Sequence, residues 1–281
     1  MQLTVFLAVL AAAFLHATWN ALVKQGGGKM RAMLIMTLLQ GGFGAGVALA
    51  YPLPQGPIWG WLLASGMFHS AYKLFLGFAY EHGDLSRVYP IARGAAPLIV
   101  LGAGTLLLTD GIDRITPAEL LGIVTLGAGI ALMARGALKN HEATALIPLA
   151  LGSALMTAGY SIVDGMGARL SGNAVSYVAW LFVLDALIFT PLALLLQGAG
   201  LLWGPRRDWL RGSLAAAASY GAYAVAVWAM TKAPIALVAA LRETSILFAV
   251  LMGWLVFGET MDRVKAGAAL LILTGVILTR I

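Results

Sequence analysis

The stretch that decides the fold is Pro234–Gly258, which reads PIALVAALRETSILFAVLMGWLVFG. Its 25 residues are apolar except around one charged pair, Arg242-Glu243, near the middle. A helix needs about 20 mostly apolar residues to cross the hydrocarbon core of a bilayer, so this stretch predicts a membrane-spanning helix. A charged side chain at that depth is costly in lipid, which makes Arg242 and Glu243 candidates for a functional site.

The rest of the chain has the same character. Of its 281 residues 60% are hydrophobic and 11% charged, with a mean hydropathy of +0.89, whereas soluble domains carry roughly 25% charged residues. These values exclude a soluble globular protein. Breaks at charged, Gly, Pro and Asn residues predict an all-α integral membrane protein with ten spans: Leu3–Val23, Arg31–Tyr51, Ile58–Tyr80, Arg87–Thr109, Pro117–Arg135, Ala145–Ala168, Ala174–Gln197, Asp208–Thr231, Pro234–Gly258 and Arg263–Arg280.

An internal repeat is visible around the middle of the chain. A shift of 149 positions sets Arg93 on Arg242, whereas the first spans of the two halves need a shift of about 141. Five spans on each side of the polar stretch 136–144 predict two units, 1–135 and 145–281, joined by that linker. Because five is an odd number, the two units must lie in the membrane in opposite orientations, as in many secondary transporters.

Two segments carry a resemblance to a known family. The C-terminal run LVFGETMDRVKAGAALLILTGVIL, Leu255–Leu278, resembles the ending of EamA-type transporters of the drug/metabolite transporter superfamily, and HATWNALVK, His16–Lys24, resembles their first helix. The first-half run from Leu106 to Leu132 is similar but has Asp110 in place of the glutamate. The resemblance implies a ten-helix carrier of small organic molecules in the cytoplasmic membrane that works by alternating access. It does not specify a substrate.

The basic residues serve as topology signals. The 18 Lys and Arg are scattered singly, which does not suit nucleic acid. With ten spans, eleven of these residues lie on the side of the membrane opposite to both termini, and four lie on the same side as the termini. Because basic loops favour the cytoplasm, this bias favours termini outside the cytoplasm, whereas the resemblance implies termini inside it. Single cysteines in the cysteine-free chain, for example at Gly204, would distinguish the two orientations with a membrane-impermeant thiol reagent.

Motifs of catalysis are not visible. The sequence has no HExxH or GxSxG pattern, and Gly26–Lys29 lacks the spacing of a phosphate-binding loop. Cysteine is missing, and the 4 histidines are too spread for a convincing metal site. We therefore expect no enzyme, no catalytic residue, no cofactor and no metal. The expected partners are membrane lipid, a small-molecule substrate and, for coupling, protons.

Polar residues inside the predicted spans point to a shared polar interior, because lipid tolerates them poorly. His16, Asn20 and Lys24 recur four residues apart in the first span and form one stripe. We predict proton coupling by Asp164 and Glu243. We predict substrate contacts by His16, Trp19, Asn20, Tyr72, Lys73, Tyr89, Arg93, Tyr160, Tyr223 and Arg242.

The residue types narrow the substrate. Arginines favour a carboxylate or phosphate, which a guanidinium binds with two parallel hydrogen bonds. The acids and aromatic rings suit an ammonium group. An amino-acid-like or zwitterionic metabolite satisfies both sets, while purely cationic or anionic compounds remain alternatives.

The structural alternative is that the charges only fix helix packing. Three intramembrane bases are matched by three acids, so a non-transporting scaffold held by ion pairs is a second hypothesis. The bases are Lys73, Arg93 and Arg242, and the acids are Asp164, Asp185 and Glu243.

Proline and glycine suggest local roles. Arg93 lies between Pro90 and Pro97, which can open a helix. We therefore expect Arg93 to contact substrate and Arg242 to be the arginine paired with an acid on another helix. Gly42 and Gly46 are predicted to allow close helix approach.

Overall fold

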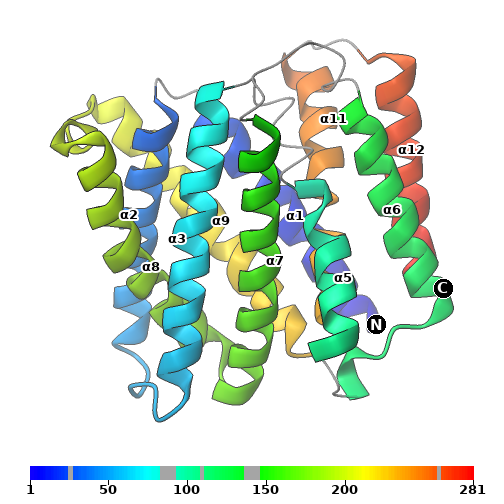
Figure 1. The fold of residues 1–281 in the computed structure, drawn as a ribbon, viewed down its shortest axis with the longest axis horizontal. Helices are drawn as coiled ribbons and strands as arrows, with labels where there is room; N and C mark the ends of the chain where they lie inside the picture. The colour runs from blue at the N-terminus through cyan, green and yellow to red at the C-terminus, as the bar shows by residue number, and fades with distance from the viewer. Residues whose placement is uncertain (25–27, 83–92, 108–110, 136–145, 258–260) are drawn as a thin grey trace.

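The computed structural model describes residues 1–24, 28–82, 93–107, 111–135, 146–257 and 261–281. The regular elements among them are helices (Figure 1). The predicted site residue Tyr89, together with Pro90, Asp110 and the linker 136–144, lies outside these ranges. The helices are α1 (Leu3–Lys24), α2 (Lys29–Ala48), α3 (Ile58–His82), α5 (Ala96–Leu107), α6 (Pro117–Arg135), α7 (Leu146–Ser171), α8 (Ala174–Gln197), α9 (Arg206–Met230), α10 (Ile235–Arg242), α11 (Ser245–Phe257) and α12 (Arg263–Leu278), with short 3-10 turns η1 (Gly111–Asp113) and η2 (Ala199–Leu202).

The described helices follow the predicted spans closely. Helix α8 coincides with the predicted Ala174–Gln197, and α6 with Pro117–Arg135. Within the described residues, six helical stretches are long and apolar enough to cross a membrane, and α6 adds a shorter apolar helix. Large side chains such as Leu187 and Leu270 are exposed on the outer faces, where a bilayer would cover them. The all-helical membrane fold is therefore confirmed.

The ninth predicted span differs from the expectation of one helix. It consists of α10 and α11, which are separated at Glu243-Thr244. The Thr244 hydroxyl donates to the Leu241 carbonyl at 2.7 Å, a local bond that competes with the helical pattern. A similar interruption follows Arg93. Residues 93 and 94 are helical, the chain bends at residue 95, and α5 begins at Ala96. Both arginines of the aligned pair therefore precede a helix interruption.

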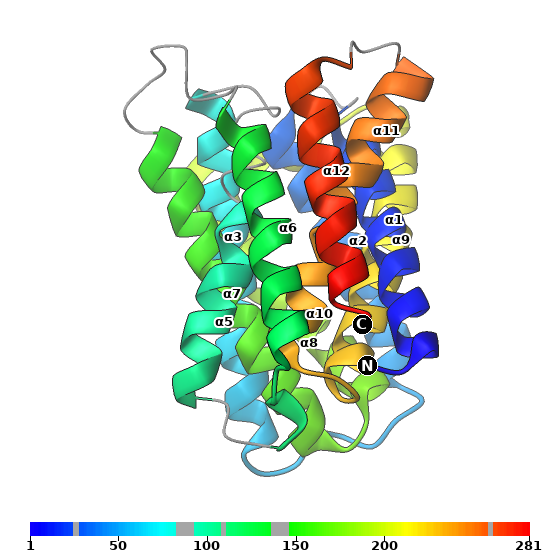
Figure 2. The same cartoon turned by 90° about the vertical axis from the view of Figure 1, so that its right-hand side faces the viewer.

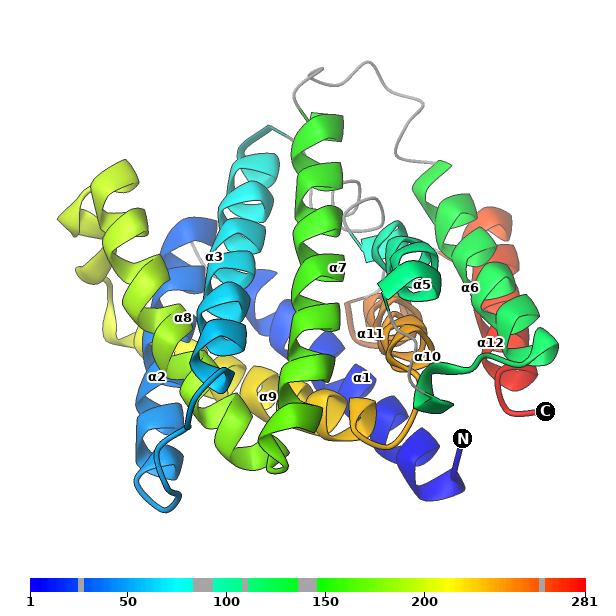
Figure 3. The ribbon, with the colours of Figure 1, turned by 60° about the horizontal axis from the view of Figure 1, so that its bottom comes forward.

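The arrangement of neighbouring helices has a regular pattern. Helix α3 packs along α7 as α9 packs along α1, and α3 contacts α8 as α9 contacts α2. Helix α5 contacts α7 as α11 contacts α1, while α2 pairs with α8 and α6 with α12. Figure 3 shows α7 beside α3 on one side of the molecule and α1 beside α9 on another. If every helix label is shifted by six, so that α1 becomes α7 and α7 becomes α1, this set of contacts stays the same.

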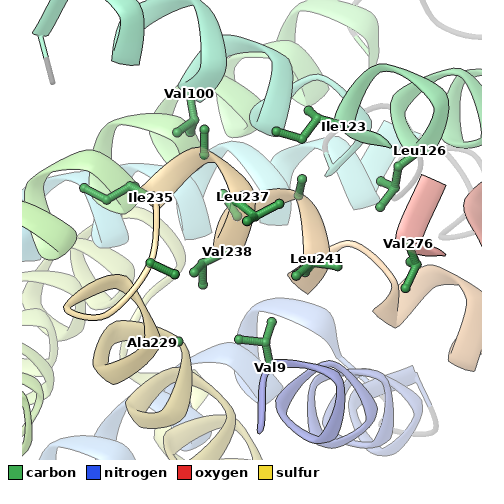
Figure 4. Close-up of a cluster of buried hydrophobic side chains, with 14 of the residues drawn as sticks. Val9, Val100, Ile123, Leu126, Ala229, Ile235, Leu237, Val238, Leu241 and Val276 are labelled. Atoms are coloured by element: carbon green, nitrogen blue, oxygen red, sulfur yellow. The ribbon is translucent and has the colours of Figure 1, made fainter. Parts of the chain in front are cut away.

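Helix α10 lies at the centre of the bundle, and all eight of its residues are buried. Side chains from α1, α5, α6 and α12 surround it, including Val9, Val100, Ile123 and Val276 (Figure 4). Arg242 and the interruption after it therefore lie inside protein rather than in lipid. This is the setting in which irregular backbone is tolerated at membrane depth.

Both termini lie near each other, in the lower half of Figure 2. The Met1 amino group is 3.9 Å from Glu119 at the start of α6. The C-terminal end is close by, since a Cβ on Gly122 would lie 2.8 Å from the Thr279 nitrogen. Glu119 also accepts from the Thr116 backbone nitrogen at 2.9 Å, in a reciprocal cap that starts α6.

Close approach of α2 and α8 depends on glycines other than those expected. A Cβ on Gly41 would lie 2.5 Å from the Ala186 Cβ, and one on Gly44 would lie 2.5 Å from the Ala179 carbonyl oxygen. Gly42 and Gly46 have open space around them and are exposed. The prediction for Gly42 and Gly46 was wrong because spacing identifies a helix face but not what that face contacts.

We expect Gly44→Ala to destabilise the bundle by about 1–3 kcal/mol, the typical cost of forcing an extra methyl group into a packed interface. Gly46→Ala is the matched control on the same helix. It should be neutral or stabilising by up to about 1 kcal/mol, because Ala is the better helix former. Thermal unfolding in detergent measures both. Equal stability of the two variants would contradict the packing described here.

Candidate substrate site

Asp164 on α7 is the centre of a buried hydrogen-bonded cluster. Its carboxylate is inaccessible to solvent and accepts hydrogen bonds from side chains of three other helices. His69 Nε2 lies 3.0 Å from Oδ2, the Tyr177 hydroxyl donates at 3.2 Å, and the Tyr223 hydroxyl also donates to Oδ2. Helices α3, α7, α8 and α9 thus meet at one acidic group.

Aromatic rings form one side of this cluster. The His69 ring stacks on Tyr160 with centroids 4.1 Å apart and planes 16° apart. Tyr223 stands edge-on to both, at 5.0 Å from His69 and 5.7 Å from Tyr160, and Tyr72 is edge-on to Tyr160 at 5.7 Å. The ring faces of tyrosines attract cations. The structure therefore brings together the predicted site residues Tyr72, Tyr160, Asp164 and Tyr223.

Arg242 faces the same rings. Its guanidinium carbon is 5.0 Å from the Tyr223 ring centre and 5.8 Å from that of Tyr160, and one of its nitrogens is 3.4 Å from the Tyr160 hydroxyl. The Arg242 side chain is 5% exposed. A guanidinium can bind an anionic group, and the ring faces that Arg242 now covers would accept a cationic group if Arg242 moved away.

The two interrupted helices are joined by an ion pair. Arg93 Nε donates to Glu243 Oε2 at 2.9 Å, and both side chains are almost completely buried. We expected Arg242 to be the arginine with an acidic partner on another helix, and this expectation was wrong. The acid that neighbours Arg242 in sequence points to Arg93 instead, because consecutive helical positions diverge by about 100°.

Helix α1 adds the stripe that the sequence predicts. His16 Nδ1 accepts from the indole nitrogen of Trp19 at 3.1 Å, and the Asn20 amide donates to the His16 carbonyl at 2.8 Å. Helix α1 packs against α10 and α11, and the buried Arg242 is the last residue of α10. The stripe of α1 therefore belongs to the helices that surround the interruption after Arg242.

Comparison with known proteins fits this architecture. Residues 144–281 match the model of the EamA-like transporter family. This part of the chain, just under half of it, is therefore EamA-like. EamA-like proteins are transporters of the drug/metabolite transporter superfamily rather than enzymes, and the apolar helices of this chain fit a membrane protein of that kind.

Solved structures share the fold. One of them, described only as "Crystal structure of protein", has a TM-score of 0.79 and 19% sequence identity, and the match covers 100% of this chain and 99% of that one. At this identity the likeness concerns the fold alone. No curated protein matches the chain.

Lys73 has a different set of partners. Its ammonium donates to Asp185 on α8 and to the Thr37 hydroxyl on α2 at 2.8 Å, and it lies 4.5 Å from the Phe189 ring centre. Ser70 donates to the other Asp185 oxygen at 3.3 Å. Among the described residues, Lys73 shares no hydrogen-bond partner with Asp164 or the arginines. The structure therefore does not place Lys73 with the other predicted site residues.

Two features of the site were missed or undervalued in the sequence. The side chains of Tyr177 and His69 are hydrogen-bonded to the Asp164 carboxylate, although neither was predicted to contact substrate. Asp113 and Arg169 form an ion pair, with one N–O distance of 3.0 Å, in which Arg169 lies beyond Asp164 near the C-terminal end of α7. The only sequence signal for Asp113 is its alignment with Asp262.

The Asp113–Arg169 pair ties together one end of the bundle. Asp113 also accepts from the Ile235 backbone nitrogen at 3.0 Å, and Arg169 donates to the carbonyls of Met230 at 2.9 Å and Ala233 at 3.2 Å. The elements joined are η1, the end of α7, the end of α9 and the start of α10. Asp113 also borders a pocket of about 330 Å³ that is otherwise lined mainly by apolar residues of α5, α6 and α10.

Asp185→Asn should destabilise the protein by about 3–5 kcal/mol, because it leaves the buried Lys73 ammonium without its counter-charge. The double variant Lys73→Met/Asp185→Leu should recover most of this loss, since it removes both charges at similar volume. Thermal unfolding of the purified variants is the measurement. A single variant as stable as the parent protein would show that the pair does not contribute to folding.

Proposed function

We propose that the protein is a secondary transporter of a small zwitterionic, amino-acid-like metabolite. The observation that supports this substrate class is the charge balance of the buried cluster, in which two arginines face two carboxylates. These are Arg93, Arg242, Asp164 and Glu243. A substrate with one positive and one negative group keeps this balance, whereas a purely cationic or anionic compound adds an uncompensated charge at membrane depth.

The two charged groups of such a substrate have separate binding partners. Its carboxylate would bind on the arginine side, where Arg242 and His16 lie, because a guanidinium forms strong charge-assisted hydrogen bonds with carboxylates. Its ammonium would bind at Asp164 and the faces of Tyr160 and Tyr223, by charge and by cation–π attraction. In the substrate-free protein the Arg242 guanidinium occupies these ring faces, so binding would require Arg242 to shift.

We further propose ten spans arranged as two inverted repeats, 1–135 and 145–281, that alternate access around this cluster. The exchange symmetry of the helix contacts supports the arrangement, as do the interruptions that follow both Arg93 and Arg242. The Arg93–Glu243 ion pair would then join one repeat to the other. Rocking of one repeat against the other is the usual motion of such carriers.

The proposed location is the cytoplasmic (inner) membrane. The distribution of Lys and Arg favours termini outside the cytoplasm. No motif for ATP binding is visible in the sequence, so we propose that the solute gradient or protons drive transport. Asp164 is the favoured proton carrier because its hydrogen-bond partners are two tyrosines and a histidine, whereas Glu243 is already paired with Arg93.

The test of the substrate class is uptake of a ¹⁴C-labelled mixture of the twenty proteinogenic amino acids into proteoliposomes. We expect uptake above that of protein-free liposomes, and we expect Arg242→Ala to lower it at least tenfold by removing a charge-assisted hydrogen bond of about 1.5–3 kcal/mol. Uptake of labelled amines or dicarboxylic acids instead would favour the purely cationic or anionic alternative. No flux of any of the three mixtures would favour the scaffold hypothesis.

Proton coupling makes a separate prediction. An inward proton gradient should accelerate uptake by the parent protein, and Asp164→Asn should remove that acceleration while substrate exchange continues, because an amide cannot change its charge during the cycle. Asp262→Asn is the matched control: Asp262 caps α12 through the Lys265 nitrogen at 2.8 Å, and Asn caps a helix equally well. A full response to the gradient in Asp164→Asn would exclude Asp164 as the proton carrier.

A further inference from the structure

The His16 imidazole is held in one protonation form by Trp19. Its Nδ1 atom accepts the indole N–H of Trp19 at 3.1 Å, and the two rings stand nearly perpendicular, with centroids 5.0 Å apart. An imidazolium ion has no acceptor atom, and a neutral imidazole has one donor and one acceptor. The contact with Trp19 therefore requires a neutral ring whose proton is on Nε2.

The Nε2–H donor has no hydrogen-bond partner in the described part of the chain, although it is buried. Burying a donor without a partner is costly, and almost all buried polar groups in proteins are paired. The donor lies on α1, which packs against α10 and α11, and the buried guanidinium of Arg242 is carried by the last residue of α10. A group that accepts the hydrogen bond and carries negative charge suits both the donor and this cationic side chain.

We propose, on the basis of the transporter function above, that His16 Nε2–H donates a hydrogen bond to the substrate carboxylate. Trp19 is then a positioning residue, which acts on substrate only by fixing the tautomer of His16. The Asn20 amide bonds the backbone carbonyl of His16 at 2.8 Å and so does not fix the imidazole. The stripe on α1 thus has a division of roles: one donor toward the substrate and one residue, Trp19, that orients it.

The chemistry of the site favours a carboxylate over a cation. A cation would meet a donor hydrogen, which offers it no lone pair, on a helix that packs against the helix carrying the Arg242 guanidinium. The Glu243 carboxylate does not occupy the site of the proposed acceptor, because it bonds Arg93 Nε at 2.9 Å and His16 Nε2 has no described partner.

The first experiment reads the tautomer and the binding directly. With only 4 histidines in the chain, ¹⁵N-histidine labelling gives a simple spectrum, in which His16→Gln identifies the His16 signals. We expect a neutral ring protonated at Nε2 and a saturable shift of that signal on titration with sodium acetate, but not with sodium chloride at equal ionic strength. An Nδ1-protonated ring, no shift with acetate, or an equal shift with chloride would each overturn the proposal.

Variants separate the donor from the residue that positions it. His16→Phe should weaken the acetate-dependent rise in melting temperature at least tenfold in apparent affinity, while His16→Gln, which keeps an N–H donor, should retain part of it. Trp19→Phe keeps the ring and removes the indole N–H, so a mixture of His16 tautomers should appear. Trp180→Phe is the matched control, because the Trp180 indole nitrogen is buried without a described partner. Unchanged tautomers in Trp19→Phe would exclude the positioning role.

Acetate binding does not depend on transport, so the two proposals fail independently. Acetate binding at His16 without amino-acid flux would overturn the proposed amino-acid-like substrate and leave the carboxylate site. Amino-acid flux without any acetate effect on His16 would leave the transporter and overturn the role of His16.

Discussion

The cost of leaving a charge alone in a membrane is the constraint on which this structure depends. Water is not there to solvate a buried ion, so each charge needs an opposite charge, a set of hydrogen bonds or an aromatic face nearby. The protein uses all three solutions. Lys73 has a counter-ion, Asp164 has three donors, and Arg242 lies over two tyrosine rings. These contacts determine which helices meet, since most of them join helices that are not consecutive in the sequence.

The position of the cluster follows from the helix interruptions. Glu243 and Thr244 turn the chain inside the bundle, where α10 is buried on all sides. Arg242 and Glu243 are consecutive residues with helical backbone angles and diverge by about 100°, so Arg242 reaches the tyrosines while Glu243 reaches Arg93. Placing both residues at the buried interruption gives one short segment contacts with two different parts of the site.

Much of the fold could be predicted because the length of an apolar stretch is a local property. The bounds of α6 and α8 follow directly from where the sequence becomes polar, and the stripe of His16 and Asn20 follows from helical spacing. The partners of charged residues could not be predicted in the same way. Arg93 and Glu243 are separated by 150 positions, so their pairing depends on how the helices pack. The glycines of α2 illustrate the same limit, since spacing does not distinguish a face toward α8 from a face toward lipid.

The Asp113–Arg169 pair has a consequence for how the molecule can move. Separating α7 from the junction of α9 and α10 at that end breaks the ion pair together with the bonds to Met230, Ala233 and Ile235. Because these contacts share two side chains, losing one weakens the others, and the separation is cooperative rather than gradual. In the alternating access proposed above, a passage opening at this end would therefore spend little time half open. Short-lived half-open states would limit the leak of solutes and ions that dissipates gradients across a membrane.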